Sequence, residues 1–394
     1  MKKIAVIGAG SAGILSLCHF IYYFEEYQIV SIHDPNIPFI GIGESTNPLF
    51  IDSMQNALHI GDFGEFIKSK NLDATLKHGT LFKNWRDIEF LNPLFGQGLG
   101  GWEAIHFNTH KLKDFAFERL SLFWGDRFKK IQGTVTELKN GEDTCTVTVD
   151  NQNYDFDYVV DCRGYPKDST GYMSFDMPLN HGLIHNVPIG DDWGYTLHQA
   201  TPNGWLFAVP LTSRVSYGYL FNSDITDIDE ARQNFSSIIN VPVNELDSLE
   251  YKFKAYCTEK IIDGRIIKNG NAAFFFEPMI ANSLWLGNFI NRAAADHIKL
   301  GVTQDITNQK FRNKALEIHD LICYYYHGGS NYDTDFWKYA VEYSTTRLET
   351  SPSFKEIKNR FKYMRENNCV IETISPYSTE SLFRIDKFLG YNYF

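Results

Sequence analysis

The N-terminus of the chain holds the pattern that most limits how it can fold. The apolar run Ile4–Ile7 is typical of a buried parallel strand, and the turn Gly8–Gly13 follows it directly with the spacing Gly-x-Gly-x-x-Gly. An apolar helix is predicted from there to Phe20. Glycines at these spacings allow a tight turn, a close approach of the backbone to a pyrophosphate and close packing of helix on strand. The pattern predicts a dinucleotide-binding α/β fold, with candidate cofactor-binding residues Gly8, Gly10, Ser11, Ala12 and Gly13.

A second strand is predicted over 28–34, with Val30 and Ile32 facing inward. In dinucleotide-binding folds an acidic residue about twenty positions beyond the glycines binds the ribose hydroxyls. Asp34 is the candidate for this contact. Two alternatives remain: His33 stands at the ribose-binding position, or Asp34 only stabilises the turn that follows the strand.

The segment Asp157–Gly164 has the pattern of a buried strand that ends in Asp161-x-x-Gly164. It resembles the late strand of FAD-dependent monooxygenase-like folds, with an ordinary strand and turn as the alternative. No second Gly-x-Gly-x-x-Gly occurs, so a separate NAD(P)H domain is not predicted. FAD is therefore the predicted cofactor, with Asp161 and Gly164 among its candidate contacts.

Composition excludes several classes of protein. A chain of 394 residues with 43% hydrophobic and 22% charged residues is typical of a globular enzyme of two or three subdomains. The net charge of −11 argues against a nucleic-acid partner, because such binding depends on Lys/Arg patches. Six scattered cysteines without a Cys-x-x-Cys pair suit a reducing cytoplasm, and no apolar stretch reaches membrane-spanning length. We expect a cytoplasmic protein without a membrane partner.

A lysine motif is the most specific indication of chemistry. The segment Asp73–Trp85 contains Lys77 among apolar residues, and it follows the glycine element Gly41–Thr46. Together the two segments resemble the flavin-dependent halogenase family of the tryptophan-halogenase type, in which a lysine in this context is catalytic. Lysine suits that role because its ammonium donates several hydrogen bonds and loses its proton readily when buried. The resemblance implies that Lys77 is the catalytic residue and that the flavin contacts include Gly43, Glu44 and Ser45.

The element Gly204–Leu211 resembles the family's Gly-Trp-x-Trp-x-Ile-Pro-Leu motif, whose two tryptophans are thought to separate the flavin from the substrate. Here Trp205 keeps the first tryptophan, and Phe207 replaces the second with an apolar ring that lacks the indole N–H. The resemblance implies a flavin–substrate wall formed by Trp205, Phe207 and Pro210. A half-buried aromatic strand is the alternative.

The segment Gly270–Ser283 departs most from the family pattern. Asn271 replaces an aspartate on the flavin side, and Ile280 stands where the family has a catalytic glutamate. The resemblance implies that Asn282 and Ser283 bind halide through backbone N–H groups, which do not depend on side-chain identity. Glu44 and Glu277 are the candidate replacements for the missing glutamate, and the sequence places neither of them near Lys77.

The helical segments 318–327 and 333–337 resemble the family's C-terminal signature, so the resemblance covers nearly the whole chain. It implies a discontinuous FAD-binding domain (1–170 and 260–300), a β-rich substrate-side layer (171–259) and a C-terminal helical region (301–394). The chain is shorter than typical tryptophan-specific members, which implies a more open substrate site.

The implied function is halogenation of an indole- or phenol-like ring that consumes reduced FAD, dioxygen and chloride, bromide or iodide. Hypohalous acid would be delivered to Lys77, a separate reductase would supply reduced FAD, and a homodimer is a candidate assembly. A hydroxylating flavin monooxygenase and a flavin-binding protein without halogenating turnover are the alternatives. No metal is predicted, because the i, i+4 pairs His106/His110 and His181/His185 lack an intervening glutamate.

Overall fold

The computed structural model describes residues 1–37, 41–42, 44–61, 63–68, 71–94, 104–188, 193–367, 369, 379–391 and 393. The chain divides into two compact units. The first unit comprises Met1–Ala74, Phe107–Ser174 and Tyr256–Asn313, and the second comprises Thr75–His106, Phe175–Ala255 and Lys314–Phe394. The predicted division into a FAD-binding domain, a β-rich layer and a C-terminal helical region stays a prediction.

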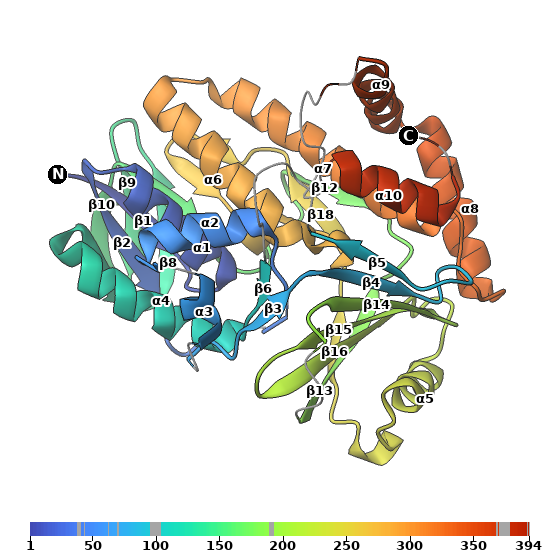
Figure 1. The fold of residues 1–394 in the computed structure, drawn as a ribbon. Coiled ribbons are helices and arrows are strands. Elements are labelled where there is room, and N and C mark those ends of the chain that lie inside the picture. The colour runs from blue at the N-terminus through green and yellow to red at the C-terminus, as the bar shows by residue number, and fades with distance from the viewer. Residues whose placement is uncertain are drawn as a thin grey trace. The chain divides into compact units, whose positions relative to one another are not determined.

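The first unit is built on a six-stranded sheet in the order β19-β20-β11-β1-β2-β7. Figure 1 labels its strands β1 and β2, which pair with each other. All neighbours pair in parallel except β19, which runs antiparallel to β20. A parallel sheet whose central strand leads into a glycine turn and a helix is the predicted dinucleotide-binding α/β architecture, which is confirmed. The strands are β1 (Lys2–Ile7), β2 (Tyr27–His33), β7 (Phe128–Gln132), β11 (Tyr158–Asp161), β19 (Ile262–Asp263) and β20 (Ile266–Lys268).

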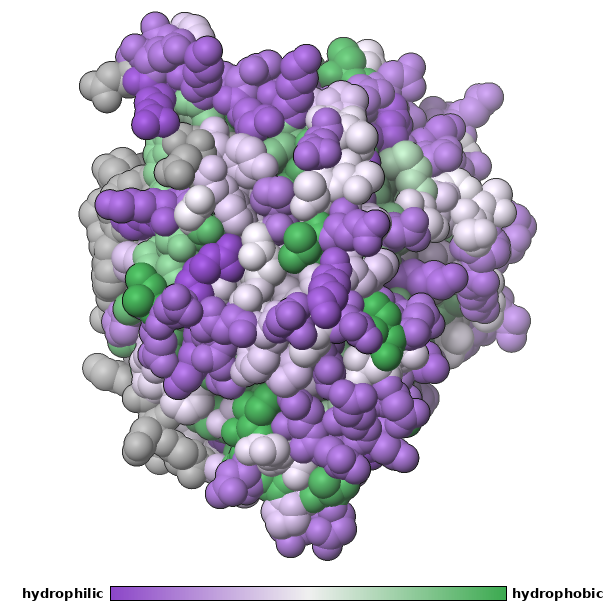
Figure 2. Space-filling model, turned by 90° about the vertical axis from the view of Figure 1, so that its right-hand side faces the viewer, coloured by the Kyte–Doolittle hydropathy of each residue, from purple (hydrophilic) through white to green (hydrophobic). Residues whose placement is uncertain are grey.

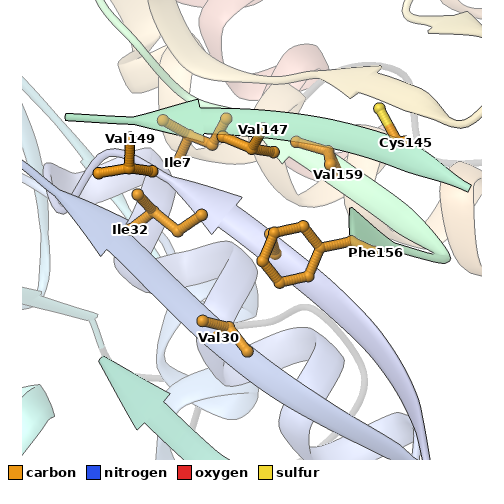
Figure 3. Packing of buried hydrophobic residues seen from close by; sticks show 9 residues of the cluster. Ile7, Val30, Ile32, Cys145, Val147, Val149, Phe156 and Val159 are labelled. Atoms are coloured by element: carbon orange, nitrogen blue, oxygen red, sulfur yellow. The ribbon is translucent and has the colours of Figure 1, made fainter. Parts of the chain in front are cut away.

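An antiparallel sheet formed by β8 (Val135–Asn140), β9 (Cys145–Val149) and β10 (Gln152–Phe156) also belongs to this unit. Val147 and Val149 alternate with threonines along β9, so one face of the strand is apolar. Figure 3 shows this face against Ile7 and Ile32 of the parallel sheet, and all four side chains are buried. The predicted inward positions Val30 and Ile32 both belong to this core.

Helices and short strands complete the first unit. Helix α1 is apolar around most of its surface, as expected for a helix buried between other elements. The helices are α1 (Ser11–Tyr23), α2 (Pro48–Ala57), α3 (Phe63–Lys68), α4 (Thr109–Trp124) and α6 (Asn282–Leu300), with short 3-10 turns η1 (Gly125–Arg127), η3 (Gly270–Ala272) and η4 (Met279–Ala281). A small sheet contains β12 (Tyr172–Phe175), β18 (Ala255–Thr258) and β21 (Phe274–Phe275).

The second unit contains a seven-stranded sheet in the order β17-β13-β16-β15-β14-β4-β5. Helix α5 (Ile228–Ile239) packs against one face of this sheet. Leu206 and Ala208 of the sheet belong to the buried cluster on that face. Because side chains alternate along a strand, Trp205 and Phe207 point to the opposite face. The strands are β4 (Gly79–Lys83), β5 (Phe90–Pro93), β13 (His181–Pro188), β14 (Thr196–Thr201), β15 (Gly204–Pro210), β16 (Arg214–Phe221) and β17 (Leu249–Lys252), and a separate pair is formed by β3 (Thr75–Lys77) and β6 (Ala104–His106).

The C-terminal part is helical, as predicted. Its helices are α7 (Gln304–Tyr326), α8 (Asp335–Thr350), α9 (Pro352–Glu366) and α10 (Thr379–Leu389). Helix α7 contributes residues to both units. The 3-10 turn η2 (Val243–Glu245) lies earlier in the second unit. Within the residues that the structure describes, no helix is long and apolar enough to cross a bilayer. On the face drawn in Figure 2, hydrophilic side chains dominate and hydrophobic ones occur in small separate groups.

Candidate active site

The glycine turn has the geometry that a bound pyrophosphate requires. Gly8 has a φ of +100°, and a Cβ there would lie 2.8 Å from the carbonyl oxygen of Cys162. A Cβ on Gly13 would lie 2.0 Å from the carbonyl oxygen of Gly8. Gly10 is the N-cap of α1, and a glycine has no side chain that could cap the helix. The first N–H groups of α1 thus keep their capacity to bind an anion, which fits the phosphates of a flavin dinucleotide.

Other predicted cofactor contacts of the first unit lie beside this turn. The carbonyl oxygen of Cys162, the residue after Asp161, would lie 2.8 Å from a Cβ on Gly8, so the end of β11 is close to the turn. Gly270, next to Asn271, has a φ of +58°, and a Cβ on it would lie 2.5 Å from the Cβ of Ala12. The structure therefore brings together the glycine turn, the end of β11 and η3, which are far apart in the sequence.

A buried polar cluster that sequence reasoning missed holds these elements together. The amide nitrogen of Asn269 lies within hydrogen-bonding distance of three acceptors: the carbonyl oxygen of Gly287 (3.0 Å), Oδ1 of Asn291 (2.9 Å) and Oγ of Ser16 (3.1 Å). Ser16 Oγ also lies 2.9 Å from the carbonyl oxygen of Ala12. The only sequence signal was a polar residue, Ser16, within an apolar helix.

The two predicted acidic contacts already have partners within the protein. Asp34 accepts from the N–H of Asn36 (2.9 Å) and from the hydroxyl of Thr134 (2.5 Å), and these hydrogen bonds lower the pKa of its carboxyl group. Asp161 accepts two hydrogen bonds from the Arg163 guanidinium, at 2.9 and 2.8 Å. Both residues lie at the C-terminal edge of the parallel strands, where ligands bind in such sheets. Their contact with FAD stays a prediction.

The second glycine element is described only in part, because Gly43 lies outside the described residues. Glu44 is 2% exposed. Its carboxylate accepts from the N–H of Thr109 (3.4 Å) and its carbonyl oxygen accepts from the N–H of Phe107 (2.9 Å). Ser45 lies in an isolated β-bridge. Glu44 therefore supports the start of α4 (Thr109–Trp124).

The predicted halide site begins helix α6. Ala281, its N-cap residue, has φ and ψ of 51° and 44°, a left-handed conformation that is uncommon for a residue with a Cβ. Asn282 and Ser283 follow in the first turn, and the methyl side chain of Ala281 cannot cap the helix. Their backbone N–H groups are thus at a helix N-terminus, where anions are favoured. Halide binding itself stays a prediction.

Lys77 ends strand β3 in the second unit and is 5% exposed. Burial lowers the pKa of its ammonium group to about 7. Its charge in turn lowers the pKa of His106 and of His198, adding to the larger effect of burial on each imidazole. Lys77 therefore shares a water-poor environment with two histidines. The candidate carboxylates Glu44 and Glu277 belong to the first unit.

Hydrogen bonds determine which nitrogen of His106 carries a proton. A carbonyl oxygen only accepts, so the single hydroxyl proton of Thr75 goes to the carbonyl oxygen of Pro210, at 2.6 Å. The Thr75 oxygen then accepts from Nδ1 of His106, at 3.1 Å. Because burial and the charge of Lys77 keep the pKa of His106 well below its ordinary value, the ring is neutral and has one N–H. Its Nε2 accepts from the hydroxyl of Thr196, at 2.9 Å.

The predicted wall residues belong to the same unit. Trp205 is fully buried, and its indole N–H donates to the hydroxyl of Tyr326 (2.9 Å). Phe207 is 8% exposed and lies over Gly218, where a Cβ would be 2.1 Å from its ring. The carbonyl oxygen of Pro210 on β15 accepts a hydrogen bond from Thr75 of β3, the strand that ends in Lys77. The structure thus brings together Lys77 and the three wall residues, and adds His106, Thr196 and His198, which sequence reasoning did not assign to the site.

The sequence matches the tryptophan halogenase family over residues 3–122 and 104–374. The chain belongs to the tryptophan halogenase family. This halogenase is 19% identical to the 7-chloro-L-tryptophan 6-halogenase of Kutzneria sp. (strain 744), over 94% of this chain and 86% of that protein. It is 22% identical to the tryptophan 7-halogenase of Lentzea aerocolonigenes, over 86% and 78% of the two chains.

The fold of this halogenase is also that of solved relatives. The tryptophan halogenase of Shewanella frigidimarina superposes with a TM-score of 0.83 at 17% identity, covering 100% of this chain and 89% of that one. Family membership makes the protein a flavin-dependent enzyme that halogenates an aromatic substrate with reduced flavin and dioxygen. The hydroxylating monooxygenase and the flavin-binding protein without turnover are not favoured.

Proposed function

We propose that this halogenase binds FAD at the Gly8–Gly13 turn and that Lys77 directs hypohalous acid onto an electron-rich aromatic ring. When bound, reduced FAD supplies the oxidation of chloride, bromide or iodide by dioxygen to hypohalous acid. One observation carries the role of Lys77: it is 5% exposed and its pKa is lowered to about 7. Near neutral pH such a lysine is present both as an ammonium that donates hydrogen bonds and as a nucleophilic amine.

The residues of the first unit have separate proposed roles. The first N–H groups of α1 hold the pyrophosphate, and Asp34, Asp161, Gly164 and Asn271 contribute further flavin contacts. The N–H groups of Asn282 and Ser283 hold the halide, since uncapped N–H groups at a helix start attract anions.

The residues of the second unit control what happens to the hypohalous acid. Trp205, Phe207 and Pro210 separate the flavin from the substrate, and the buried apolar surroundings of Lys77 exclude water that would otherwise let the reagent escape. Lys77 protonates the departing hydroxide or first takes up the halogen, and either route requires the amine to exchange a proton near neutral pH.

The substrate we propose is an indole- or phenol-like compound. The named relatives act on tryptophan or chlorotryptophan. We expect a more open site here, which accepts several free-standing aromatics. A separate reductase is the proposed source of reduced FAD, because the chain has one dinucleotide-binding glycine motif. Cytoplasmic location and a homodimer remain expectations.

The function is tested by supplying FAD, a flavin reductase, NADH and dioxygen with each halide and a panel of indoles and phenols. Mass spectrometry should find a halogenated product that appears only with halide present. A hydroxylated product that forms without halide would instead identify a monooxygenase.

A further inference from the structure

His198 shares the wall face of the seven-stranded sheet. It lies on β14, opposite Phe207 of β15 and Phe82 of β4 in the strand register. Its ring centroid is 4.8 Å from that of Trp205 and 5.4 Å from that of Phe82. Facing residues on neighbouring strands project from the same side, so the imidazole stands among the rings proposed to line the substrate side.

Nδ1 of the His198 imidazole is buried inside the second unit. The residue is 5% exposed, and its Nδ1 is buried without a hydrogen bond among the residues that the structure describes. An unpaired buried polar atom costs free energy, and a ligand that gives His198 a hydrogen bond or a proton would relieve that cost. Both nitrogens of His106, by contrast, are hydrogen-bonded to threonines.

Strand β14 is held firmly at this position. The carbonyl oxygen of His198 accepts from the indole N–H of Trp85 (3.1 Å), and Phe82 stacks on Tyr325 with centroids 5.7 Å apart. A fixed backbone and packed neighbours limit the rotation of the imidazole. Its free nitrogen is therefore presented in a defined direction.

Lys77 and His198 are electrostatically coupled. Burial first, and the charge of Lys77 second, lower the pKa of His198 to about 3, so its ring is neutral and can accept a proton. Among the described residues, Lys77 is the charged group whose electrostatic repulsion lowers the pKa of this imidazole. Once Lys77 has released a proton, its charge no longer opposes protonation of His198. The imidazole then becomes more basic at the moment a proton must be taken up.

We propose that His198 is a further catalytic residue, which accepts the proton that the aromatic ring loses when halogen replaces it. The proposal rests on the proposed function of Lys77. In the step, the ring carbon forms a bond to the halogen of hypohalous acid, and the halogen–oxygen bond breaks with its electron pair on oxygen. The Lys77 ammonium protonates the hydroxide, which leaves as water. The ring C–H bond breaks, its electrons restore the aromatic system, and its proton goes to the unprotonated ring nitrogen of His198.

His198 and Lys77 return to their starting protonation states by exchanging one proton. The proton on His198 passes to the neutral amine of Lys77, which restores the starting charges. The net reaction is ArH + HOX → ArX + H2O, so no other oxidant or base is consumed. No carboxylate is required beside Lys77, and this is consistent with isoleucine at position 280.

The direct test is a primary isotope effect on product formation with an indole deuterated at the halogenated carbon. His198→Phe keeps the ring packing between Phe82 and Trp205, and His198→Gln keeps polarity without a basic nitrogen. In both variants we expect product formation per flavin oxidised to fall ~10²-fold or more. The isotope effect should be close to unity in the wild type and clearly above unity in the variants, because proton loss becomes rate-limiting.

The control is His181→Gln, since His181 is also buried on this sheet with an unpartnered Nδ1 but pairs with Glu250. It should leave both readouts unchanged. A fall in rate without an isotope effect in the His198 variants assigns a structural role to His198 and overturns the proposal. Unchanged rates overturn it as well.

A second measurement does not depend on flavin or on turnover. In protein labelled at histidine, the NMR titration of His198 should move to higher pH in Lys77→Met, because the opposing charge is gone. An unmoved titration overturns the coupling. If Lys77→Ala keeps full yield, the proposed function fails; if Lys77→Ala abolishes product while the His198 variants behave like the wild type, only the role of His198 fails.

Discussion

The hydroxyl of Thr75 donates a hydrogen bond of 2.6 Å to the carbonyl oxygen of Pro210. Thr75 lies two residues before Lys77 on β3, and Pro210 is the last residue of the wall strand β15. The same hydroxyl oxygen accepts from His106. One threonine thus fixes the strand of the proposed catalytic lysine against the strand that carries the wall.

We predict that Thr75→Val lowers halogenation while leaving flavin binding unchanged. Valine has nearly the same shape, but it leaves Pro210 without its donor and His106 without its acceptor, which costs about 1–3 kcal/mol. A displacement of Lys77 by such a change should lower product formation roughly 10–100-fold. Thr75→Ser retains the hydroxyl and is the matched control; equal activity of the valine variant and the wild type would contradict the prediction.

His106 should carry its proton on Nδ1 and remain neutral throughout the mildly acidic range. The hydrogen bond from Thr75 to Pro210 leaves the Thr75 oxygen as an acceptor, and the pKa of His106 is held well below its ordinary value. Heteronuclear NMR of the imidazole nitrogens should find a protonated Nδ1 and a bare Nε2 at pH 6 and pH 8. A proton on Nε2, or a titration near the usual histidine pKa, would show that the network is arranged differently.

Lys77→Met should stabilise the protein at and below neutral pH. The folded-state pKa of Lys77 is about 7, against 10.5 for an unperturbed lysine. Below pH 7 both the folded and the unfolded state bind the proton, so the full cost of burying the charge is present. Between pH 7 and 10.5 only the unfolded state binds it, so wild-type stability rises with pH by up to ~1.4 kcal/mol per unit.

Urea denaturation of both proteins at pH 6 and pH 9 measures this difference. The methionine variant should exceed the wild type by about 1–4 kcal/mol at pH 6, and the difference should shrink at pH 9. Equal stability at pH 6 would mean that Lys77 is hydrated in solution.

Flavin binding should depend on the glycine turn in a graded way. Gly10→Val places a branched side chain where the backbone must approach the pyrophosphate, so we expect flavin fluorescence quenching to be lost. Gly164→Ala adds a Cβ that meets no protein atom within 4 Å, so it should fold normally. Weaker quenching in that variant would therefore report a contact with the flavin itself. Unchanged affinity in a folded Gly10→Val variant would exclude the turn as the site.

Much of the first unit could be predicted because its signals are local. The apolar run before Gly8 and the strand over 28–34 follow directly from the sequence, and both elements are found as β1 and β2. The burial of Lys77 was implied only by the family resemblance. The partners of Asp34 could not be foreseen, because Thr134 is brought to it by the pairing of β2 with β7.

The surroundings of Lys77 depend on tertiary pairing. Thr75, His106, Thr196 and Pro210 come from four strands, and no periodicity links them. No sequence motif marks His198, and only the strand register places it opposite Phe207. Such sites are assembled by the fold, so a single sequence reveals the residue types but not their neighbours.

The role of Lys77 is tested most directly by comparing wild type with Lys77→Ala at equal flavin oxidation and equal halide concentration. Product yield and the position of halogenation on one indole are measured by liquid chromatography and mass spectrometry. We expect a single main regioisomer from the wild type, and from the variant almost no product while flavin oxidation continues. The same regioisomer at the same yield from both proteins would contradict it, because hypohalous acid would then act without Lys77.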